Sequence, residues 1–428
     1  MRCKGTFFFV NTKFLEVLLR FAKLYYLCGM KYRAYKYRLY PNEEQKVLIA
    51  KHLGSCRFIY NYALAKKVKA FQTDKTNLSR FDIQADLPNM KKSDEYCWLK
   101  EVNSLSLQAS LANLDSAYAR FFREHKGFPR FKSKKDSKQS FSIPQNTKVD
   151  FENGRIFIPK FKSGIKAILH RTFDGIVKTS TITRTSTGKY FISILVEVDE
   201  PDVSMKPICE NKAVGIDLGI KTFAVLSDGT EIPNPKHLKQ SLDKVKKLQR
   251  SLLHKTKGSK NRGKARRKLA LAHEQVTNRR NDFLHKVTSY LVNNYDTICL
   301  EDLNVKGMIK NHHLAQSLSD IAIGTFNTLL EYKAKERGVN ILRIGRFEPS
   351  SKMCTCGYIN HNLTLAMREW TCPECGSIHD RDFLAANNIK RFAFRNINTV
   401  GTTEIYACGD MSEVTCAAHE THELLAHG

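Results

Sequence analysis

The sequence is short of acidic residues and of long uncharged hydrophobic runs. Its 428 residues include 42 Asp and Glu against 70 Lys and Arg, a formal net charge of +28. The N-terminal segment 1–29 is rich in Phe and Leu, but it carries charges at Lys13, Glu16, Arg20 and Lys23. It therefore predicts neither a transmembrane helix nor a secretory signal. A polyanion, nucleic acid above all, is the expected partner, and a membrane is not.

The cysteines do not form the pattern of a disulfide framework. Most of the 12 are scattered singly, and only the segment from Cys354 to Cys375 contains a cluster. This distribution is typical of a reducing cytoplasm and of a metal site. No internal repeat is visible, and the length suffices for two or three compact units.

One acid stands in a strand-like setting. Lys212 to Gly229 reads KAVGIDLGIKTFAVLSDG, in which two apolar runs flank Asp217 and a final Asp-Gly predicts a tight hairpin turn. Burying a carboxylate on a central strand is costly unless a cation or hydrogen bonds compensate it. Asp217 is therefore a candidate metal ligand, with an ordinary strand-end acid as the alternative.

Further acids occur in comparable settings. A β-rich run, 295–300, ends on Glu301, and HDRDFLAANNI presents Asp380 and Asp382 before a helical run of small residues. Converging carboxylates repel one another unless divalent cations lie between them, and oxygen ligands suit Mg²⁺ or Mn²⁺. Two such ions can activate a water and stabilise the leaving oxygen of a phosphodiester.

Three segments carry a resemblance to a known family. GIDLGIKTFAVLSDG, LEDLNVKGMIKNHHLAQSLSDIAIGTF and HDRDFLAANNI resemble the acidic motifs of the RuvC-type nuclease of the TnpB family, the transposon-encoded relatives of type V CRISPR effectors. The resemblance implies an α/β fold with an RNase H-like (RuvC) core. It also implies that Asp217, Glu301 and Asp382 are catalytic and bind magnesium or manganese.

The function implied by the resemblance is RNA-guided cleavage of DNA by a protein of a prokaryotic insertion sequence. Its partners would be a guide RNA and target DNA in the cytoplasm, at the nucleoid. Two alternatives stay open, namely a non-cleaving, repressor-like RNA-guided binder and a guide-free transposase or junction nuclease. The oligomeric state is also open, a homodimer included.

The N-terminal half is expected to contain the nucleic-acid-binding regions. Residues 1–29 are interpreted as an extension from an upstream start codon, with an appended amphipathic helix as the alternative. Residues 30–41 predict a strand, and 42–126 predict helices that begin with a capping box at Asn42 and Gln45. Arg57 and Asn61 match the R-x-x-Y-N signature of the family's helical recognition region, and a surface salt bridge is the other interpretation of Arg57.

Aromatic and basic residues alternate in GFPRFKSKKDSK, residues 127–138. Its cations can bind phosphates while its rings stack on bases or sugars; they are Arg130, Lys132, Lys134 and Lys135. Short strands follow to residue 210, and with strand 30–41 they predict a small β-barrel similar to the family's wedge domain. A solvated basic loop is the alternative.

The predicted nuclease core, 211–349, contains a basic helical hairpin at 235–292. Gly258 and Gly263 mark its expected turn. Its position between the first two acids favours a nucleic-acid groove that includes Lys264, Arg266 and Arg267. A solvated charged face is the ordinary alternative.

Residues 350–378 resemble the family's zinc ribbon. Cys372 and Cys375 have the usual C-x-x-C spacing, whereas Cys354 and Cys356 are one residue closer. Four cysteines are the expected zinc ligands; His361 or His379 could join them, and a metal-free loop is the alternative.

A second departure from the family is Leu384, which stands where the family has Asn. Together with the short spacing it predicts a weakened nuclease, in which restoring both features raises zinc content and cleavage. Residues 379–395 would complete the core, and 396–428 would form a flexible tail.

Overall fold

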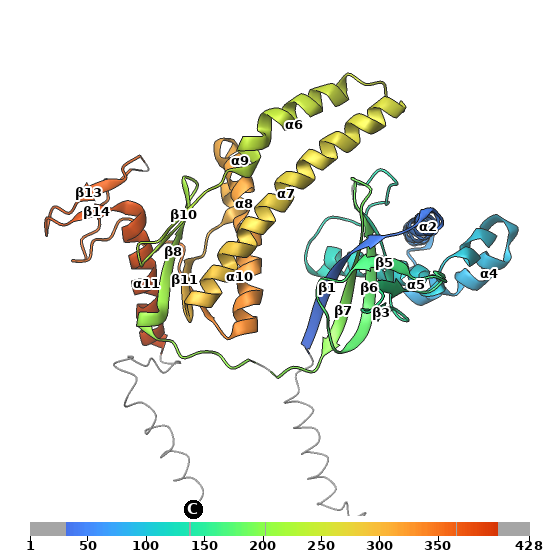
Figure 1. Cartoon of the computed structure of the whole chain (residues 1–428), viewed down its shortest axis with the longest axis horizontal. Coiled ribbons are helices and arrows are strands. Elements are labelled where there is room, and N and C mark those ends of the chain that lie inside the picture. Colours follow the sequence, from blue (N-terminus) through green and yellow to red (C-terminus); the bar gives the residue numbers. More distant parts are fainter. Residues whose placement is uncertain (1–30, 137, 202, 365, 401–428) are drawn as a thin grey trace, which may run out of the picture. The chain divides into compact units, whose positions relative to one another are not determined.

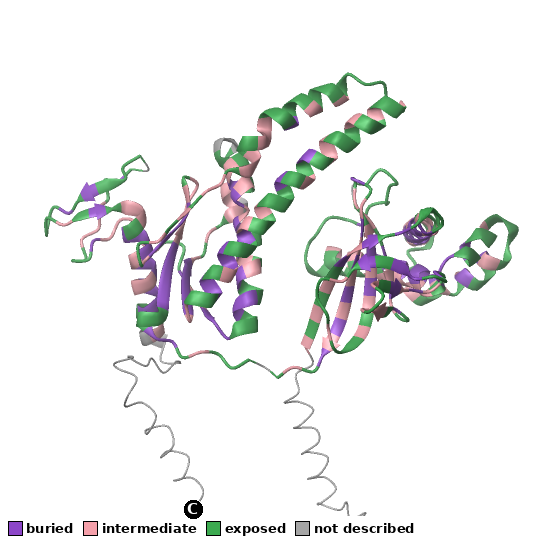
Figure 2. Ribbon diagram, viewed as in Figure 1, coloured by how far each residue is buried: buried purple, intermediate pink, exposed green. Residues whose placement is uncertain are grey.

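The computed structural model describes residues 31–400, except for 137, 202 and 365. The chain divides into two compact units, Met1–Asp202 and Val203–Gly428, and each has its own buried core (Figures 1 and 2). The interpretations of residues 1–29 and of the tail beyond Val400 lie outside the described residues. No described helix has both the length and the apolar character needed to cross a bilayer.

The first unit contains one antiparallel sheet of seven strands in the order β2-β6-β7-β1-β5-β4-β3. The strands are β1 (Lys31–Tyr40), β2 (Gln139–Ile143), β3 (Lys148–Asp150), β4 (Arg155–Phe157), β5 (Ile165–Ile168), β6 (Ile176–Arg184) and β7 (Tyr190–Val198). The predicted strand 30–41 joins this sheet as expected. The predicted closure into a barrel is not observed, because no ladder among the described residues joins the edge strands β2 and β3. Helices bury the apolar face instead.

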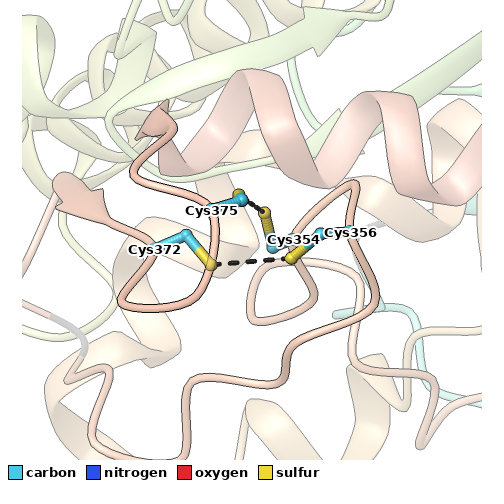
Figure 3. A group of neighbouring side chains, drawn as sticks. All are labelled: Cys354, Cys356, Cys372 and Cys375. Atoms are coloured by element: carbon cyan, nitrogen blue, oxygen red, sulfur yellow. Dashed lines mark hydrogen bonds between the residues drawn. The ribbon is translucent and has the colours of Figure 1, made fainter.

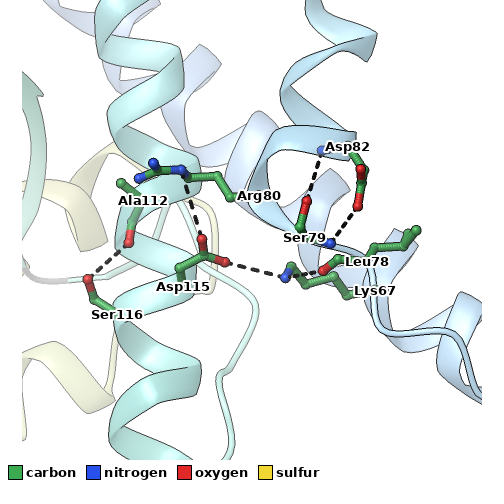
Figure 4. Close-up of polar contacts among 8 residues, drawn as sticks. All are labelled: Lys67, Leu78, Ser79, Arg80, Asp82, Ala112, Asp115 and Ser116. Atoms are coloured by element: carbon green, nitrogen blue, oxygen red, sulfur yellow. Dashed lines mark hydrogen bonds and ion pairs between the residues drawn. The ribbon is translucent and has the colours of Figure 1, made fainter. Parts of the chain in front are cut away.

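These helices are α2 (Glu43–Asp74), α3 (Arg80–Gln84), α4 (Asp86–Lys92), the 3-10 helix η1 (Asp94–Glu101) and α5 (Ser104–Arg123). The predicted capping box of Asn42 and Gln45 begins α2. One core joins Tyr37 of β1 with apolar residues of α2, α5 and β7. Asp115 of α5 forms ion pairs with Lys67 of α2 and Arg80 at the start of α3 (Figure 4). The helices and the sheet are thus one packed body.

The second unit contains a mixed sheet of five strands in the order β10-β9-β8-β11-β12. Its strands are β8 (Ala213–Leu218), β9 (Thr222–Leu226), β10 (Glu231–Pro233), β11 (Thr297–Glu301) and β12 (Asn340–Ile344). The predicted hairpin joins β9 to β10, and β8, β11 and β12 run parallel. The carboxyl ends of these three strands consequently lie at one edge of the sheet.

Helices cover both faces of this sheet (Figure 1). They are α6 (His237–Leu253), α7 (Lys260–Asn294), α8 (Val305–Met308), α9 (His312–Ile321), α10 (Ile323–Arg337) and α11 (Arg381–Val400). Val214 and Ile216 pack toward α7 and α10, whereas Ala213 and Cys299 pack toward α11. This division follows from the alternation of side chains along a strand.

Two details differ from the sequence-based expectations. The predicted hairpin is formed by α6 and α7, and Gly258, at φ +89°, lies in its turn. Gly263 lies inside α7 instead, because Ser259 caps that helix by accepting a hydrogen bond from the amide of Arg262. The final helix also continues five residues beyond 395, so 396–400 are helical.

Candidate metal centres

Two of the predicted acids lie side by side. Ile216 of β8 pairs with Leu300 of β11, so Asp217 and Glu301 follow at the carboxyl ends of neighbouring parallel strands. Both lie two residues beyond positions that face α11, and alternation directs them to that same face. The strands predicted around Asp217 and before Glu301 are thus present as β8 and β11.

A glycine brings the third acid to the same place. A Cβ at Gly215 of β8 would lie 2.0 Å from the carbonyl oxygen of Ala386, so only glycine permits this approach of β8 and α11. Asp382 lies in the first turn of α11. Asp380 has a different role, because its Oδ1 accepts a hydrogen bond from the amide of Phe383 at 2.8 Å and caps the helix. The sequence pattern did not predict that Gly215 allows this close contact, although the glycine stands two residues before Asp217.

The three acids share one electrostatic environment. Desolvation raises the pKa of Asp217 to about 7, and the carboxylates of Glu301 and Asp382 add to this effect, while nearby arginines oppose it. Glu301 accepts a hydrogen bond from the hydroxyl of Ser350. Both oxygens of Asp382 accept from Nη1 of Arg368, at 2.9 Å each. The site thus holds more negative charge than its arginines neutralise, and its oxygen donors suit a hard divalent cation.

The oxygens of the three carboxylates are nevertheless farther apart than the ligand atoms of a preformed metal site. Among the described residues, one group of three or more Cys, His, Asp or Glu side chains has all its ligand atoms within 4.8 Å of one another. That group consists of four cysteines, not of the three acids. Both oxygens of the third acid accept from Arg368 in this arrangement.

A basic groove of about 630 Å³ is linked to this site by Arg368, which lines the groove and pairs with Asp382. Its cations are Lys221, Lys236, Lys239 and Arg368, and Ile220 and Leu314 supply apolar wall. The acid in its wall, Asp320, accepts hydrogen bonds from the amide of Leu238 and from Arg280. A polyanionic strand is therefore the ligand that fits this lining. Sequence reasoning missed the groove because four separated segments form it, although Lys221 stands in the turn directly after Asp217 and Leu218.

The four cysteines predicted to bind zinc lie together (Figure 3). Sγ of Cys354 lies 3.5 Å from Sγ of Cys375, and Sγ of Cys356 lies 3.6 Å from Sγ of Cys372. Tetrahedral zinc with Zn–S bonds of about 2.3 Å separates its sulfurs by about 3.8 Å, so the spacing fits the ion. The short spacing of the first pair does not keep the sulfurs apart. Two short strands, β13 (Glu369–Thr371) and β14 (Ile378–Asp380), support the second pair.

Only one of the two candidate histidines adjoins these sulfurs. Nε2 of His379 lies 2.9 Å from Sγ of Cys354, and desolvation lowers the pKa of this buried histidine. His361 is exposed and does not belong to the cysteine group. Leu384 of α11 packs with Cys354, Leu363, Trp370 and Cys372 in one apolar cluster. The cysteine site therefore packs against α11 through Leu384, which lies two residues after Asp382.

The predicted nucleic-acid-binding residues have different environments. Asn61 holds the basic loop, because its amide oxygen accepts from the backbone N–H of Lys132 at 2.8 Å and its Nδ2 donates to the carbonyl of Lys132 at 2.9 Å. Arg57 lines a cavity of about 160 Å³ together with Lys132. The Lys132 ammonium lies 4.0 Å from the ring centroid of Tyr60, and desolvation lowers its pKa. The remaining residues are exposed, on the loop at Arg130, Lys134 and Lys135 and on α7 at Lys264, Arg266 and Arg267.

Family models match three parts of the chain. Residues 193–312 match a model described as "Probable transposase", OrfB_IS605, and residues 324–389 match the Cas12f1-like TNB domain. A Streptomyces pristinaespiralis protein named "Putative RNA-guided DNA endonuclease" is 39% identical over 360 residues, 83% of this chain and 88% of that protein. The chain belongs to the TnpB family. A second TnpB relative, "Putative RNA-guided DNA endonuclease InsQ" of Escherichia coli K12, is 32% identical over 394 residues, 89% of this chain and 94% of that protein.

The third family model, a helix-turn-helix domain, matches residues 30–76 of this TnpB chain. This segment contains β1 and the single helix α2, so the described structure has no turn between two helices there. A solved structure, "Cryo-EM structure of the Cas12f1-sgRNA-target DNA complex", has the same fold, with a TM-score of 0.50 and 14% identity. The match covers 84% of this chain and 99% of that chain.

Proposed function

We propose that this TnpB-family protein is an RNA-guided DNA endonuclease whose RNase H-like (RuvC) core hydrolyses phosphodiester bonds of target DNA. The observation that carries the proposal is the shared site of Asp217, Glu301 and Asp382, in which the pKa of Asp217 rises to about 7. The names of the relatives and the guide RNA and target DNA in the Cas12f1 complex support the assignment of partners.

Asp217, Glu301 and Asp382 would hold magnesium, or manganese, through their carboxylate oxygens. When bound, the metal activates a water and stabilises the leaving oxygen of the phosphodiester. Ser350 orients Glu301 by donating to its carboxylate. Lys221, Lys236 and Lys239 bind the phosphates of the strand that reaches the acids. Arg368 neutralises Asp382 and forms part of the groove wall.

Zinc has a structural role in this proposal. Cys354, Cys356, Cys372 and Cys375 supply the ligands, and the apolar cluster that includes Leu384 fixes the zinc ribbon against α11. Since the same helix carries Asp382 in its first turn, an ordered ribbon stabilises the position of the third acid.

The predicted basic residues bind the nucleic-acid backbone, since phosphate contacts provide affinity without reading sequence. In the first unit these are Arg57, Arg130, Lys132, Lys134 and Lys135. In the second unit they are Lys264, Arg266 and Arg267. Asn61 acts indirectly, because both ends of its amide hold the backbone of the basic loop.

Co-expression with the adjoining genomic sequence, followed by sequencing of the RNA that copurifies, tests the proposal. Cleavage of a matching target should require that RNA and Mg²⁺, and Asp217→Ala should abolish it while leaving DNA binding intact. Glu231→Ala is the matched control, because this exposed acid belongs to β10 of the same sheet and lies outside the site. Equal cleavage by the Asp217→Ala variant and the wild type would reject the proposed site.

The alternatives give different results in the same assay. A repressor-like binder would bind guided DNA without cutting it, and a guide-free nuclease would cut without RNA. The mass of the purified complex gives its stoichiometry, and a homodimer predicts two chains per particle.

A further inference from the structure

Phe347 is the most exposed large hydrophobic residue in the described part of the chain. Its side chain is 94% exposed, whereas Ile378, the next, is 76% exposed. Burying a phenylalanine ring stabilises by about 1.5–3 kcal/mol. The ring of Phe347 does not gain this stabilisation within the chain, so it is available to a ligand.

The turn that carries Phe347 is held in place on both sides. Nη2 of Arg346 donates to Oδ2 of Asp302 at 3.1 Å, and Glu348 forms an ion pair with Arg395 at 3.0 Å. Within the turn, the amide of Glu348 donates to the carbonyl of Gly345. These contacts fix the backbone on either side of the ring. A turn that is already ordered loses less conformational entropy when a ligand binds to its ring.

The ring also stands at one end of the row of acids. Asp217, Glu301 and Ile344 lie next to one another at the carboxyl ends of β8, β11 and β12, because Glu301 pairs with Ile344. Phe347 follows Ile344 by three residues, which span at most about 10 Å. Strands are about 4.8 Å apart. The ring is therefore within two or three nucleotides of a phosphate at Glu301.

The basic groove lies at the opposite end of the same row. Its Ile220 and Lys221 belong to the turn between β8 and β9, and β9 lies on the side of β8 away from β11. The order along the sheet edge is consequently Lys221, Asp217, Glu301 and Phe347. A strand whose phosphates bind in the groove would pass the acids before it reaches the ring.

We propose that Phe347 is a stacking platform for a base of the DNA strand bound at Asp217, Glu301 and Asp382. The inference rests on the proposed nuclease function and adds a positioning residue to it. Stacking of a base on an aromatic side chain contributes about 1–3 kcal/mol and tolerates any sequence. Protein partners usually require a contiguous apolar patch, whereas charged Arg346 and Glu348 flank this ring. An isolated ring with charged neighbours therefore fits a base better than a protein surface.

Fluorescence of 2-aminopurine in the target strand tests the proposal. The probe is placed at each of the three nucleotides on either side of the cut bond, in the full guide complex with Ca²⁺ replacing Mg²⁺. Wild type and Phe347→Trp should quench one of these positions, and Phe347→Ala should not. With Mg²⁺, Phe347→Ala should lower kcat/KM for the target by about 5- to 150-fold, the equivalent of one stacked base.

Ile378→Ala is the matched control, because it also removes an exposed apolar side chain, and it should behave as wild type. Quenching and cleavage unchanged in Phe347→Ala, with an active wild type, would reject stacking and leave the nuclease proposal intact. A change in the mass of the complex without a change in quenching would identify a protein contact and also reject stacking. Quenching lost in Phe347→Ala, with a wild type that does not cut, would support stacking and reject the nuclease.

Discussion

Nη1 of Arg368 donates to both carboxylate oxygens of Asp382, at 2.9 Å each. A metal that binds this acid must compete with the arginine for the same oxygens. Arg368→Ala should therefore lower the Mg²⁺ concentration that gives half-maximal cleavage. Since both side chains are partly exposed, the pair stabilises by about 0.2–1 kcal/mol, and the shift should be up to about fivefold.

Cleavage is measured against Mg²⁺ concentration with saturating DNA, because Arg368 also lines the groove. Arg343→Ala is the control, since it breaks a comparable partly exposed pair, with Glu331, in the same unit. A higher Mg²⁺ requirement in Arg368→Ala would mean that the arginine assists metal binding.

The pKa of Asp217 predicts that metal binding depends on pH. Without metal, desolvation and the neighbouring carboxylates hold this pKa at about 7, so the side chain is mostly protonated at pH 6. Mg²⁺ requires the carboxylate, and its binding should release about 0.9 proton at pH 6 and about 0.1 at pH 8. Apparent affinity should fall as the pH drops below 7. Calorimetry in buffers of different ionisation enthalpy counts the protons, and Asp217→Asn should abolish the release.

Adding one carbon at Gly215 should have a large effect on stability and on cleavage. Its Cβ would meet the carbonyl oxygen of Ala386 at 2.0 Å, so Gly215→Ala must separate β8 from α11. We expect a loss of about 1–3 kcal/mol or more in the free energy of unfolding, with loss of cleavage. Gly263→Ala is the opposite case, because this glycine lies inside α7 with no neighbour within 4 Å. It should stabilise by about 0.5–1 kcal/mol in urea denaturation. Equal effects of the two substitutions would refute this packing argument.

The acidic motifs were predictable because each lies on a local pattern. Strand runs locate Asp217 and Glu301, and the start of the helical run that forms α11 locates Asp382. Their convergence is a property of parallel pairing and of one close contact at Gly215, which no single segment encodes. The role of Asp380 as the cap of α11 likewise depends on where the helix begins.

Other features depend on contacts between distant segments. Asn61 matches a family signature, yet its amide holds the backbone of Lys132, 71 residues away. The expected barrel depends on whether the edge strands β2 and β3 meet, and composition cannot decide this. Phe347 was not distinguished from the buried aromatics, because a single ring in a turn has no periodic pattern.

The arrangement of sulfurs predicts one zinc ion per chain with four thiolate ligands. Cys372→Ser should lose zinc, measured by mass spectrometry of the metal content, and should lower the melting temperature. His379→Ala should retain zinc, because the histidine adjoins Cys354 while four sulfurs already complete the tetrahedron. Substitution by Co²⁺ distinguishes the ligand sets, since its absorption bands depend on the number of thiolates. A spectrum with three sulfurs and one nitrogen would assign His379 as a ligand instead.

The burial of Leu384 alters the expected result of restoring the family's residue. The side chain is 4% exposed and packs against Cys354, Leu363, Trp370 and Cys372. Leu384→Asn would remove apolar contacts that typically contribute about 2–5 kcal/mol and would bury an amide in their place. We therefore expect a lower melting temperature, weaker zinc retention and less cleavage, contrary to the gain that the family pattern alone predicts.

Leu384→Met provides the control for this substitution. It keeps the volume and apolar character of the side chain, so it should cost less than about 1.5 kcal/mol and preserve zinc and cleavage. Zinc content, melting temperature and cleavage rate are measured on the same preparations of the three proteins. If Leu384→Asn binds zinc as well as the wild type and cuts faster, the amide has found partners at the ribbon, and the chain is a nuclease weakened at this position. If both stability and cleavage fall, Leu384 is a packing residue that holds the ribbon on α11 and thereby keeps Asp382 beside Asp217.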